Sequence, residues 1–275
     1  MKILITGGNG NIAQMIRRNL NIKYDITNLS HADLDILDFN QVKEYLEKNN
    51  FDILVHTAIT GGRRTKDENG EITHKNILMF ENLIKFANKF KMIINFDSGA
   101  IYNRSTDILN RKENELYTVP TDYYGFSKYI IYNRTLNYNN CFNLRIFNIF
   151  HINEEPDRFI KSCFIAKKNN SNVKIFEDKY FDFMYEDDFI KIIDYYFDNV
   201  NNQEKLNKTI NLCYNEKYKL SDIAFLITND KSKIIIEKTT TNTNYSGNSE
   251  LLESMKINLI NLEHSLLIYK NKFNK

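Results

Sequence analysis

Apolar runs alternate with longer amphipathic stretches along the first 150 residues of the chain. Five of the runs are short and rich in β-branched or aromatic residues, as expected of buried strands: 2–6, 24–29, 51–56, 92–96 and 142–147. The stretches between them carry apolar residues at helical spacing, up to Leu20, around Val42–Leu46, over 76–90 and over 124–138. Because parallel strands need a crossover, usually a helix, this alternation predicts an α/β fold with a doubly wound parallel sheet.

The second half of the chain continues with shorter elements. Residues 152–177 indicate a strand–helix insertion, and the acidic triplet Glu186–Asp188 indicates the start of an amphipathic helix that runs to Phe197. Further elements follow in the order strand, helix, strand and one or two closing helices, over 209–213, 220–228, 233–238 and 251–269. The polar stretches 103–122 and 239–249 are predicted loops, the first of them suited to shaping a pocket.

A glycine-rich turn joins the first strand to the first helix. The segment Gly7-Gly8-Asn9-Gly10-Asn11-Ile12-Ala13 begins directly after the strand. Gly7 permits a tight turn, and Gly10 allows the backbone to approach a pyrophosphate at the helix N-terminus. Glycines in a loop more often mark only a turn, but the order strand, turn and helix at the start of a chain favours a dinucleotide site. Its first candidate residues are Gly7, Gly10, Asn11 and Ile12.

The same order of elements predicts how the chain divides. At 275 residues it exceeds the ~100–200 typical of one domain. We expect a Rossmann dinucleotide-binding domain over 1–150, to which 178–215 returns. Residues 151–177 and 216–275 then form a small C-terminal α/β lobe, which we expect to bind the substrate.

Residues after the next strands complete the candidate dinucleotide site. Asp35 and Ile36 are placed to hold an adenine edge, and Thr57 and Ala58 begin a loop of small residues at the end of a strand. The residues after the second strand include neither the acid typical of NAD binding nor the base typical of NADP binding, so they do not decide between the two cofactors. The pair Arg63-Arg64 either contacts phosphates or forms an exposed basic pair in a loop.

Tyr124 and Lys128 lie four residues apart at the start of a predicted helix, so their side chains share one face. A nearby cation lowers the pKa of a phenol from its usual value of about 10 toward the range where general acid–base catalysis works. Ser98 follows the strand 92–96 and is placed to share a substrate oxygen with Tyr124, although a serine there is usually a turn residue. Asn148 ends another strand and is placed near a sugar or a nicotinamide.

Composition narrows the class of protein further. Hydrophobic residues make up 42% of the chain and charged residues 26%, which is ordinary for a globular protein with a real core. The formal net charge of +2 argues against nucleic acid or a membrane as a partner. The three cysteines are far apart in the sequence, so we expect no metal site and no disulfide. With no signal peptide and no apolar run of ~18 residues, we expect a cytoplasmic protein.

Together these segments resemble the extended short-chain dehydrogenase/reductase family of nucleotide-sugar epimerases, dehydratases and reductases. The resemblance covers nearly the whole chain and rests on motifs in a fixed order, which run over 6–12, 35–36, 52–58, 96–102, 124–128, 144–148 and 182–188. Within the family the segments 33–38 and 56–62 are most similar to GDP-L-fucose synthases and dTDP-4-dehydrorhamnose reductases.

The resemblance implies roles for the candidate residues. Ser98, Tyr124 and Lys128 would be catalytic: the phenol exchanges a proton with a sugar oxygen, the serine orients that oxygen, and the lysine lowers the phenol pKa and holds the nicotinamide ribose. Tyr124 and Lys128 would thereby also bind the cofactor, which we expect to be NADP, with NAD possible. Ser98, Gly99 and Asn148 would bind a nucleotide sugar, and the helices 76–90 and 124–138 would form a homodimer.

Departures from the family pattern help to select a reaction. Dehydratases of the family place an Asp-Glu pair where this chain has Gly99-Ala100, and fucose synthases place a cysteine where it has Ala100. The arginine that grips a nucleotide diphosphate is Phe181 here, with Lys179 or Arg158 as possible substitutes. His151 replaces a glycine after the motif that ends with Asn148, so we expect the entrance to the substrate site to be unusual for the family.

These features favour a nicotinamide-dependent C4 reductase of a 4-keto nucleotide sugar. The alternative is a nucleotide-sugar 4-epimerase or a sugar dehydrogenase with tightly held NAD, since the same residues serve oxidation and reduction. A non-catalytic NAD(P)-binding regulatory subunit on the same fold is a third reading, because fold alone does not determine function.

Overall fold

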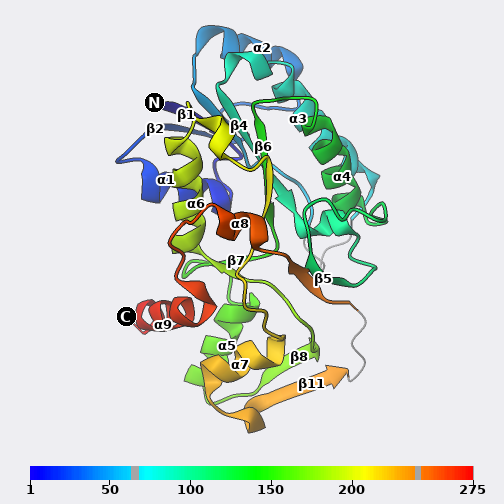
Figure 1. Ribbon diagram of the computed structural model, residues 1–275, viewed down its shortest axis with the longest axis vertical. Coiled ribbons are helices and arrows are strands. Elements are labelled where there is room, and N and C mark those ends of the chain that lie inside the picture. The colour runs from blue at the N-terminus through cyan, green and yellow to red at the C-terminus, as the bar shows by residue number, and fades with distance from the viewer. Residues whose placement is uncertain (63–67, 239–242, 275) are drawn as a thin grey trace.

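A six-stranded parallel sheet forms the centre of the protein. The structure is a computed structural model that describes residues 1–62, 68–238 and 243–274. The strands of the central sheet are β1 (Lys2–Thr6), β2 (Asp25–Leu29), β3 (Ile53–His56), β4 (Met92–Ser98), β6 (Cys141–Ile146) and β10 (Thr209–Leu212). Their order is β10-β6-β4-β3-β1-β2, and every neighbouring pair is parallel (Figure 1).

Helices cover both faces of this sheet. The helices α1 (Asn11–Leu20) and α6 (Glu186–Asp198) pack on one face, and α2 (Phe39–Lys48), α3 (Gly70–Ile84) and α4 (Tyr123–Thr135) pack on the other. Alternate strand residues face opposite layers: Ile3 and Ile5 lie in the core under α1 and α6, and Leu4 lies in the core under α2 and α3. All three are fully buried, as expected when a parallel sheet is covered on both sides. The predicted Rossmann fold is confirmed.

A smaller α/β lobe lies beyond the carboxyl ends of the strands, at the lower end of Figure 1. It contains α5 (Phe159–Lys168), α7 (Leu220–Thr228) and the parallel strand pair β8 (Val173–Glu177) and β11 (Ile234–Lys238). The chain closes with α8 (Glu250–Ser254) and α9 (Asn261–Phe273). The pairing of β10 with β6 supports our proposal that 178–215 returns to the dinucleotide-binding domain.

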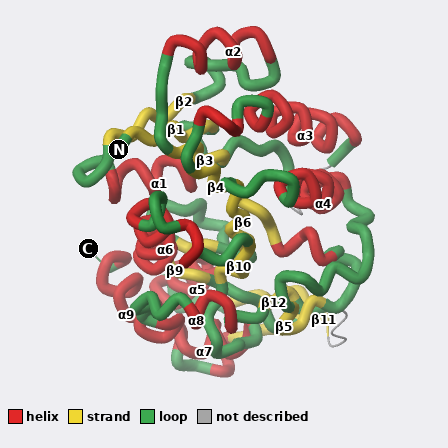
Figure 2. Tube along the Cα trace, turned by 45° about the horizontal axis from the view of Figure 1, so that its top comes forward, coloured by secondary structure: helices red, strands yellow, loops and turns green. Residues whose placement is uncertain are grey.

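Two short strand pairs join distant parts of the chain at the boundary between the sheet and the lobe. The strand β7 (Ile149–Phe150) pairs with β9 (Met184–Tyr185). The strand β5 (Ile108–Arg111) pairs with β12 (Tyr245–Gly247), and Figure 2 shows these two strands side by side. The second pairing carries a C-terminal segment to the end of the central sheet.

Several predicted boundaries differ from those observed. The helix expected over 76–90 begins at Gly70, because the side chain of Asn69 accepts a hydrogen bond from the amide of Glu71, and it gives way to a 3₁₀ turn at Ala87–Lys89. The insertion at 152–177 contains a helix followed by a strand, the reverse of the expected order. The expected loops 103–122 and 239–249 contain β5 and β12, which are stabilised by pairing with each other and have no local strand pattern.

Three further observations on the described residues concern membrane-spanning helices, metal sites and cysteines. No helix among them combines the length and the apolarity needed to cross a bilayer. Their His, Cys, Asp and Glu side chains form no group of three or more that could hold a metal ion. Cys141, Cys163 and Cys213 are buried and unpaired.

Candidate active site

The order of the strands reverses between β1 and β3, and ligands of such sheets bind in the crevice at that point. A cleft of about 580 Å³ lies there, which we call the dinucleotide cleft. Eight residues predicted to bind the cofactor line it: Gly7, Gly10, Asn11, Ile12, Asp35, Ile36, Thr57 and Ala58. The structure brings all of them together, and their contacts with a cofactor stay a proposal.

The glycine turn has the geometry that a phosphate needs. Gly7 has a φ of +71°, and a Cβ atom there would lie 2.7 Å from the Cα atom of Ala58, so a larger residue is excluded. Gly10 is the N-cap of α1 and supplies no capping side chain, and the first turn of α1 contains no acidic residue. The positive end of the helix dipole is therefore not neutralised locally and suits an anion.

The far end of the dinucleotide cleft carries side chains of both charges and neutral ones. Ser30 and His31 follow β2 and line the cleft together with Lys75 of α3. The Nδ1 atom of His31 lies 3.4 Å from a carboxylate oxygen of Asp35, and Lys75 pairs with Glu71 at 2.7 Å. The first residue after β2 is not acidic, but the carboxylate of Asp33 lies there, because it accepts hydrogen bonds from the amide of Ser30 at 2.9 Å and from its hydroxyl at 2.6 Å.

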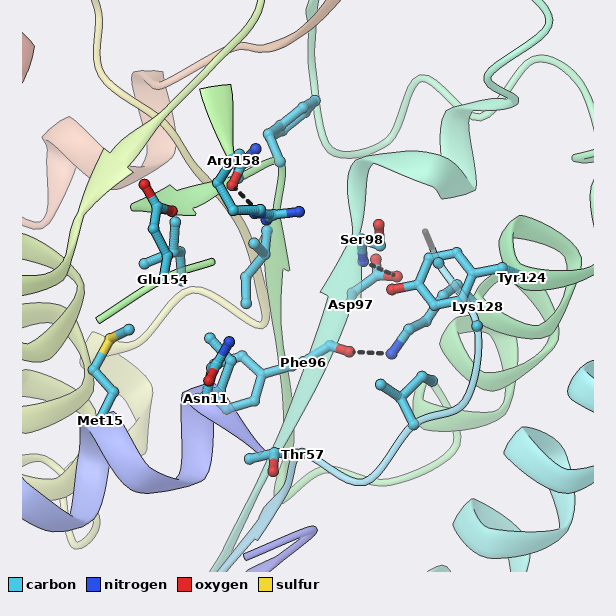
Figure 3. Close-up of a pocket in the computed structure, with 18 of the residues that line it drawn as sticks. Asn11, Met15, Thr57, Phe96, Asp97, Ser98, Tyr124, Lys128, Glu154 and Arg158 are labelled. Atoms are coloured by element: carbon cyan, nitrogen blue, oxygen red, sulfur yellow. Dashed lines mark hydrogen bonds between the residues drawn. The ribbon is translucent and has the colours of Figure 1, made fainter. Parts of the chain in front are cut away.

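A second cavity of about 320 Å³ adjoins this cleft and shares Asn11, Ile12 and Thr57 with it. We call it the catalytic cavity, because Ser98, Tyr124, Lys128 and Asn148 line it, which are the remaining candidate residues apart from Gly99. Figure 3 shows Ser98 at the end of β4, facing the phenol of Tyr124 from α4, with Lys128 below them.

The first turn of α4 positions the phenol and the ammonium. Asp122 caps this helix by accepting a hydrogen bond from the amide of Gly125 at 2.8 Å. Lys128 is buried, and its Nζ atom donates to the carbonyl oxygen of Phe96 and lies 5.8 Å from the centre of the Tyr124 ring. Burial lowers the pKa of Lys128 to about 8, although Asp97 opposes this shift.

The prediction that Tyr124 has a lowered pKa is wrong for this structure. Burial raises the pKa of Tyr124 above its usual value, because the phenolate loses its hydration. A hydrogen bond from Ser98 and the charge of Arg104 act in the opposite direction, whereas Tyr245 and Asp97 add to the increase. The free phenol therefore retains its proton at neutral pH, as a proton donor must.

A buried ion pair fixes the end of β4 next to Ser98, the candidate catalytic serine. Asp97 accepts a hydrogen bond from the backbone amide of Ser98 at 2.8 Å and one from Nε of Arg145 at 2.7 Å. Both side chains of the pair are almost fully buried. Arg145 also donates to the Tyr102 hydroxyl and to the carbonyl oxygen of Glu113, so the network joins β4 to the loop before α4.

Several residues of the catalytic cavity were not identified from the sequence. Arg104, Glu154 and Tyr245 line it, as does His151, which the sequence marked only as unusual. Their sequence neighbourhoods contain no chemical motif, and the only signal was that Arg104 and Tyr245 each lie in a predicted polar loop. A search for polar residues between strand ends would have found Glu154 but not Tyr245.

Two predictions are placed differently or not placed. Gly99 does not line either cavity, because the rings of Phe147 and Tyr245 cover it: a Cβ atom on Gly99 would lie 2.7 Å from Phe147 and 2.9 Å from the Tyr245 hydroxyl. Arg63 and Arg64 lie outside the residues that the structure describes. Of the two substitutes for the missing arginine, Arg158 lines the catalytic cavity, whereas Lys179 lies 3.5 Å from Glu177 and does not line it.

Solved structures of nucleotide-sugar enzymes share this fold. A dTDP-4-dehydrorhamnose reductase from Clostridium acetobutylicum has a TM-score of 0.81 and 18% sequence identity, and the match covers 100% of each chain. A GDP-mannoheptose C4 reductase from Campylobacter jejuni with NADP bound has a TM-score of 0.77 and 16% identity over 100% of this chain and 98% of the other. A UDP-N-acetylglucosamine 4-epimerase from Bacillus cereus has a TM-score of 0.78 and 21% identity over 100% of this chain and 96% of the other.

Sequence comparisons give the family but no individual relative. No curated protein sequence matches this chain significantly. A family model, that of the NAD-dependent epimerase/dehydratase family, matches residues 3–213, which is well over half of the 275 residues. The motifs expected from the resemblance all lie within that range. The chain belongs to the NAD-dependent epimerase/dehydratase family.

Proposed function

We propose that the protein uses NADPH to reduce the ketone of a 4-keto nucleotide sugar. One observation carries this proposal: Ser98, Tyr124 and Lys128 line a single cavity that opens into the dinucleotide cleft. Structures that share the fold include a C4 reductase with NADP bound and a dTDP-4-dehydrorhamnose reductase. The proposal transfers that type of reaction to this chain.

The chain's own residues would hold the reactants and move the proton. The glycine turn and the N-terminus of α1 would hold the pyrophosphate of the cofactor, which supplies the hydride when bound. As the new C–H bond forms at the carbonyl carbon, the C=O π electrons move to the oxygen, and the phenol of Tyr124 gives that oxygen its proton. Lys128 and Ser98 would stabilise the phenolate that remains.

The cavity supports reduction over the other reactions of the family. Elimination of water needs an acid and a base beside the sugar, and Gly99 and Ala100 offer neither. The structure leaves no room for a carboxylate at position 99, since Phe147 and Tyr245 occupy that volume. Epimerisation next to the ketone by the fucose-synthase route needs a thiol at position 100, which is also absent.

Arg158 is the proposed contact for the substrate diphosphate. It precedes α5, lines the catalytic cavity and donates from Nη2 to the Oδ1 atom of Asn148 at 3.1 Å. Figure 3 places Arg158 across the cavity from Tyr124, so a bound sugar would lie between the two side chains. A guanidinium is well suited to phosphate oxygens, since it offers several donors in one plane.

The preference for NADPH over NADH is supported by charge at the end of β2. A ribose 2′-phosphate there would meet Ser30, His31 and Lys75, which line that part of the dinucleotide cleft. The carboxylates of Asp33 and Asp35 also lie at this end of the cleft, beside Ser30 and His31, so the support for NADPH comes from the charge of Lys75. Titration of the purified protein with both cofactors measures this preference directly.

Two expectations about assembly and location remain part of the proposal. Tyr123 and Phe126 of α4 expose 47% and 37% of their surfaces beside α3, and a homodimer through these two helices would cover such apolar surface. The three unpaired cysteines suit the reducing cytoplasm. Light scattering after size-exclusion chromatography would report the mass in solution.

The test of the function is a panel of 4-keto nucleotide sugars that carry dTDP, GDP, UDP or CDP. Protein, NADPH and each sugar are mixed, and the loss of NADPH absorbance is followed alongside the acid-released nucleotide of the purified protein. Consumption of NADPH with one sugar, by a protein that retains no NAD, supports the reductase. Stoichiometric bound NAD with no NADPH consumption would instead support the 4-epimerase or dehydrogenase.

A further inference from the structure

The catalytic cavity contains a second phenol, which comes from a segment that lies far from α4 in the sequence. Tyr245 belongs to β12, and its side chain is 6% exposed. Its hydroxyl lies 3.5 Å from the Oγ atom of Ser98, and it lines the cavity with Ser98 and Tyr124. None of the roles assigned above uses this hydroxyl.

The surroundings hold the Tyr245 ring in one orientation. The ring centre lies 5.1 Å from that of Phe147 in an edge-to-face contact and 5.1 Å from that of Phe181. The backbone is also fixed, because the amide of Tyr245 donates to Tyr180 and its carbonyl oxygen accepts from Asp182. The hydroxyl therefore has a defined position next to Ser98.

Two departures from the family pattern contact this residue. Phe181 occupies the position of an expected arginine and packs on the Tyr245 ring, whereas Gly99 occupies the position of an expected carboxylate. A Cβ atom on Gly99 would lie 2.9 Å from the Tyr245 hydroxyl. Gly99 leaves room for the Tyr245 hydroxyl, and Phe181 supports the Tyr245 ring by packing on it.

The hydrogen-bonding capacity of Ser98 shows what the phenol can do. A serine hydroxyl has one proton to donate and two lone pairs that accept. One lone pair of Ser98 accepts from the amide of Ala100 at 3.2 Å. If the second accepts from Tyr245, the serine proton can point only into the cavity, toward Tyr124 and the reacting oxygen.

We propose that Tyr245 is a positioning residue, whose phenol donates to the Oγ atom of Ser98 and directs the serine proton toward the reacting oxygen. This inference rests on the proposed reduction. Hydrogen bonds of this kind are often long before the reactants bind and shorten in the reactive complex, which suits the 3.5 Å separation. Tyr245 moves no proton to the product, and the product oxygen still receives its proton from Tyr124.

The test is a double-mutant cycle of wild type, Ser98→Ala, Tyr245→Phe and the double variant, measured with a 4-keto nucleotide sugar at saturating NADPH. We expect Tyr245→Phe to lower kcat about tenfold, the loss of one hydrogen bond, and to leave KM and NADPH affinity within about twofold. In the Ser98→Ala background, Tyr245→Phe should not lower kcat further, because the hydrogen-bond partner of Tyr245 is absent there. Tyr196→Phe is the matched control, since it removes a buried phenol that bonds to Asn207 far from the cavity.

Two outcomes would overturn the inference: a kcat within twofold of wild type for Tyr245→Phe, or an equal loss of kcat in both serine backgrounds. Gly99→Ala is a second variant, because its new methyl group would clash with the Tyr245 hydroxyl and with the Phe147 ring that packs on Tyr245, and adding Tyr245→Phe to it should change kcat no further. Urea unfolding of the four proteins in the double-mutant cycle needs no substrate, and it reports whether the hydroxyls of Ser98 and Tyr245 are energetically coupled. If the effects of the two substitutions on the unfolding midpoint are coupled but no sugar is reduced, the contact stands and only the proposed function is rejected. If these effects are independent, the contact between the two hydroxyls is rejected.

Discussion

At the scale of single residues, Lys128 is a group of the catalytic cavity whose charge changes in mildly alkaline solution. Its ammonium is buried beside Tyr124, and burial lowers its pKa to about 8 from the usual 10.5. As pH rises through that value, the ammonium loses its proton and can no longer stabilise a phenolate by charge. In the proposed mechanism, Lys128 would therefore lose its stabilising effect on the phenolate in mildly alkaline solution.

We expect the kcat/KM of sugar reduction to fall above about pH 8, tenfold for each further pH unit, as Lys128 becomes neutral. Lys128→Arg keeps a positive charge at all these pH values, so its lower activity should lack that alkaline limb. Lys128→Met should be inactive throughout. Steady-state rates between pH 6 and 10 measure this, and a wild-type profile that stays level up to pH 10 would contradict it.

Arg158 gives a second prediction at this scale. Removing it by Arg158→Ala should raise KM for the nucleotide sugar about 10–100-fold, because a hydrogen bond to a charged group contributes roughly 1.5–3 kcal/mol. The Kd for NADPH should stay within about twofold of wild type. Lys168→Ala is the control, an exposed cation of α5 outside the cavity. An unchanged KM would show that another group binds the diphosphate.

At the scale of elements, the segment between β7 and α5 shapes one wall of the catalytic cavity. It carries His151 and Glu154, each 4% exposed, and neither the Nδ1 atom of the first nor the Oε1 atom of the second has a hydrogen-bond partner among the residues that the structure describes. Burial raises the pKa of Glu154 to about 7 and lowers that of His151. Buried polar groups without a hydrogen-bond partner lower the free energy of unfolding, so this wall of the cavity makes the protein less stable.

Because of Glu154, the free energy of unfolding of the protein should depend on pH. Between pH 4.5 and about 7 the unfolded chain has released the Glu154 proton while the folded chain retains it, so raising the pH favours unfolding. The shift from 4.5 to about 7 corresponds to roughly 3 kcal/mol. Glu154→Gln should abolish that loss, and its gain in unfolding free energy over wild type should be larger at pH 8 than at pH 5.

Urea unfolding at the two pH values measures this difference. Glu253→Gln, which neutralises an exposed carboxylate of α8, provides the comparison and should show almost no difference between pH 5 and pH 8. An equal effect of Glu154→Gln at both pH values would contradict the account.

The elements that the sequence predicts well are those with a strong local signal. Hydrophobic periodicity located all six strands of the central sheet and its main helices, and the glycine turn located the dinucleotide cleft. Helix boundaries were less accurate, as α3 shows, because a cap such as Asn69 lies in a polar stretch with no periodicity. The strands β5 and β12 were missed, since their pairing joins segments more than 130 residues apart, as between Ile108 and Tyr245.

At the scale of the whole molecule, the catalytic cavity is assembled from parts that are distant in the sequence. Ser98 and Asn148 could be predicted together, because the carboxyl ends of neighbouring parallel strands meet at one edge of the sheet, and Tyr124 could be predicted from its helical spacing to Lys128. Arg104 and Tyr245 could not, since loops and the β5–β12 pair carry them there. The raised pKa of Tyr124 could not be predicted either, because burial of a side chain depends on the complete fold.

The measurement that tests the central claim most directly is the NADPH-dependent turnover of a 4-keto nucleotide sugar by wild type and by Tyr124→Phe. Tyr123→Phe, in the same helical turn but half-exposed, is the control. Because the phenol supplies the proton, we expect Tyr124→Phe to lose at least about 100-fold in kcat with NADPH affinity nearly unchanged, and Tyr123→Phe to resemble wild type. Undiminished reduction by Tyr124→Phe would contradict the account.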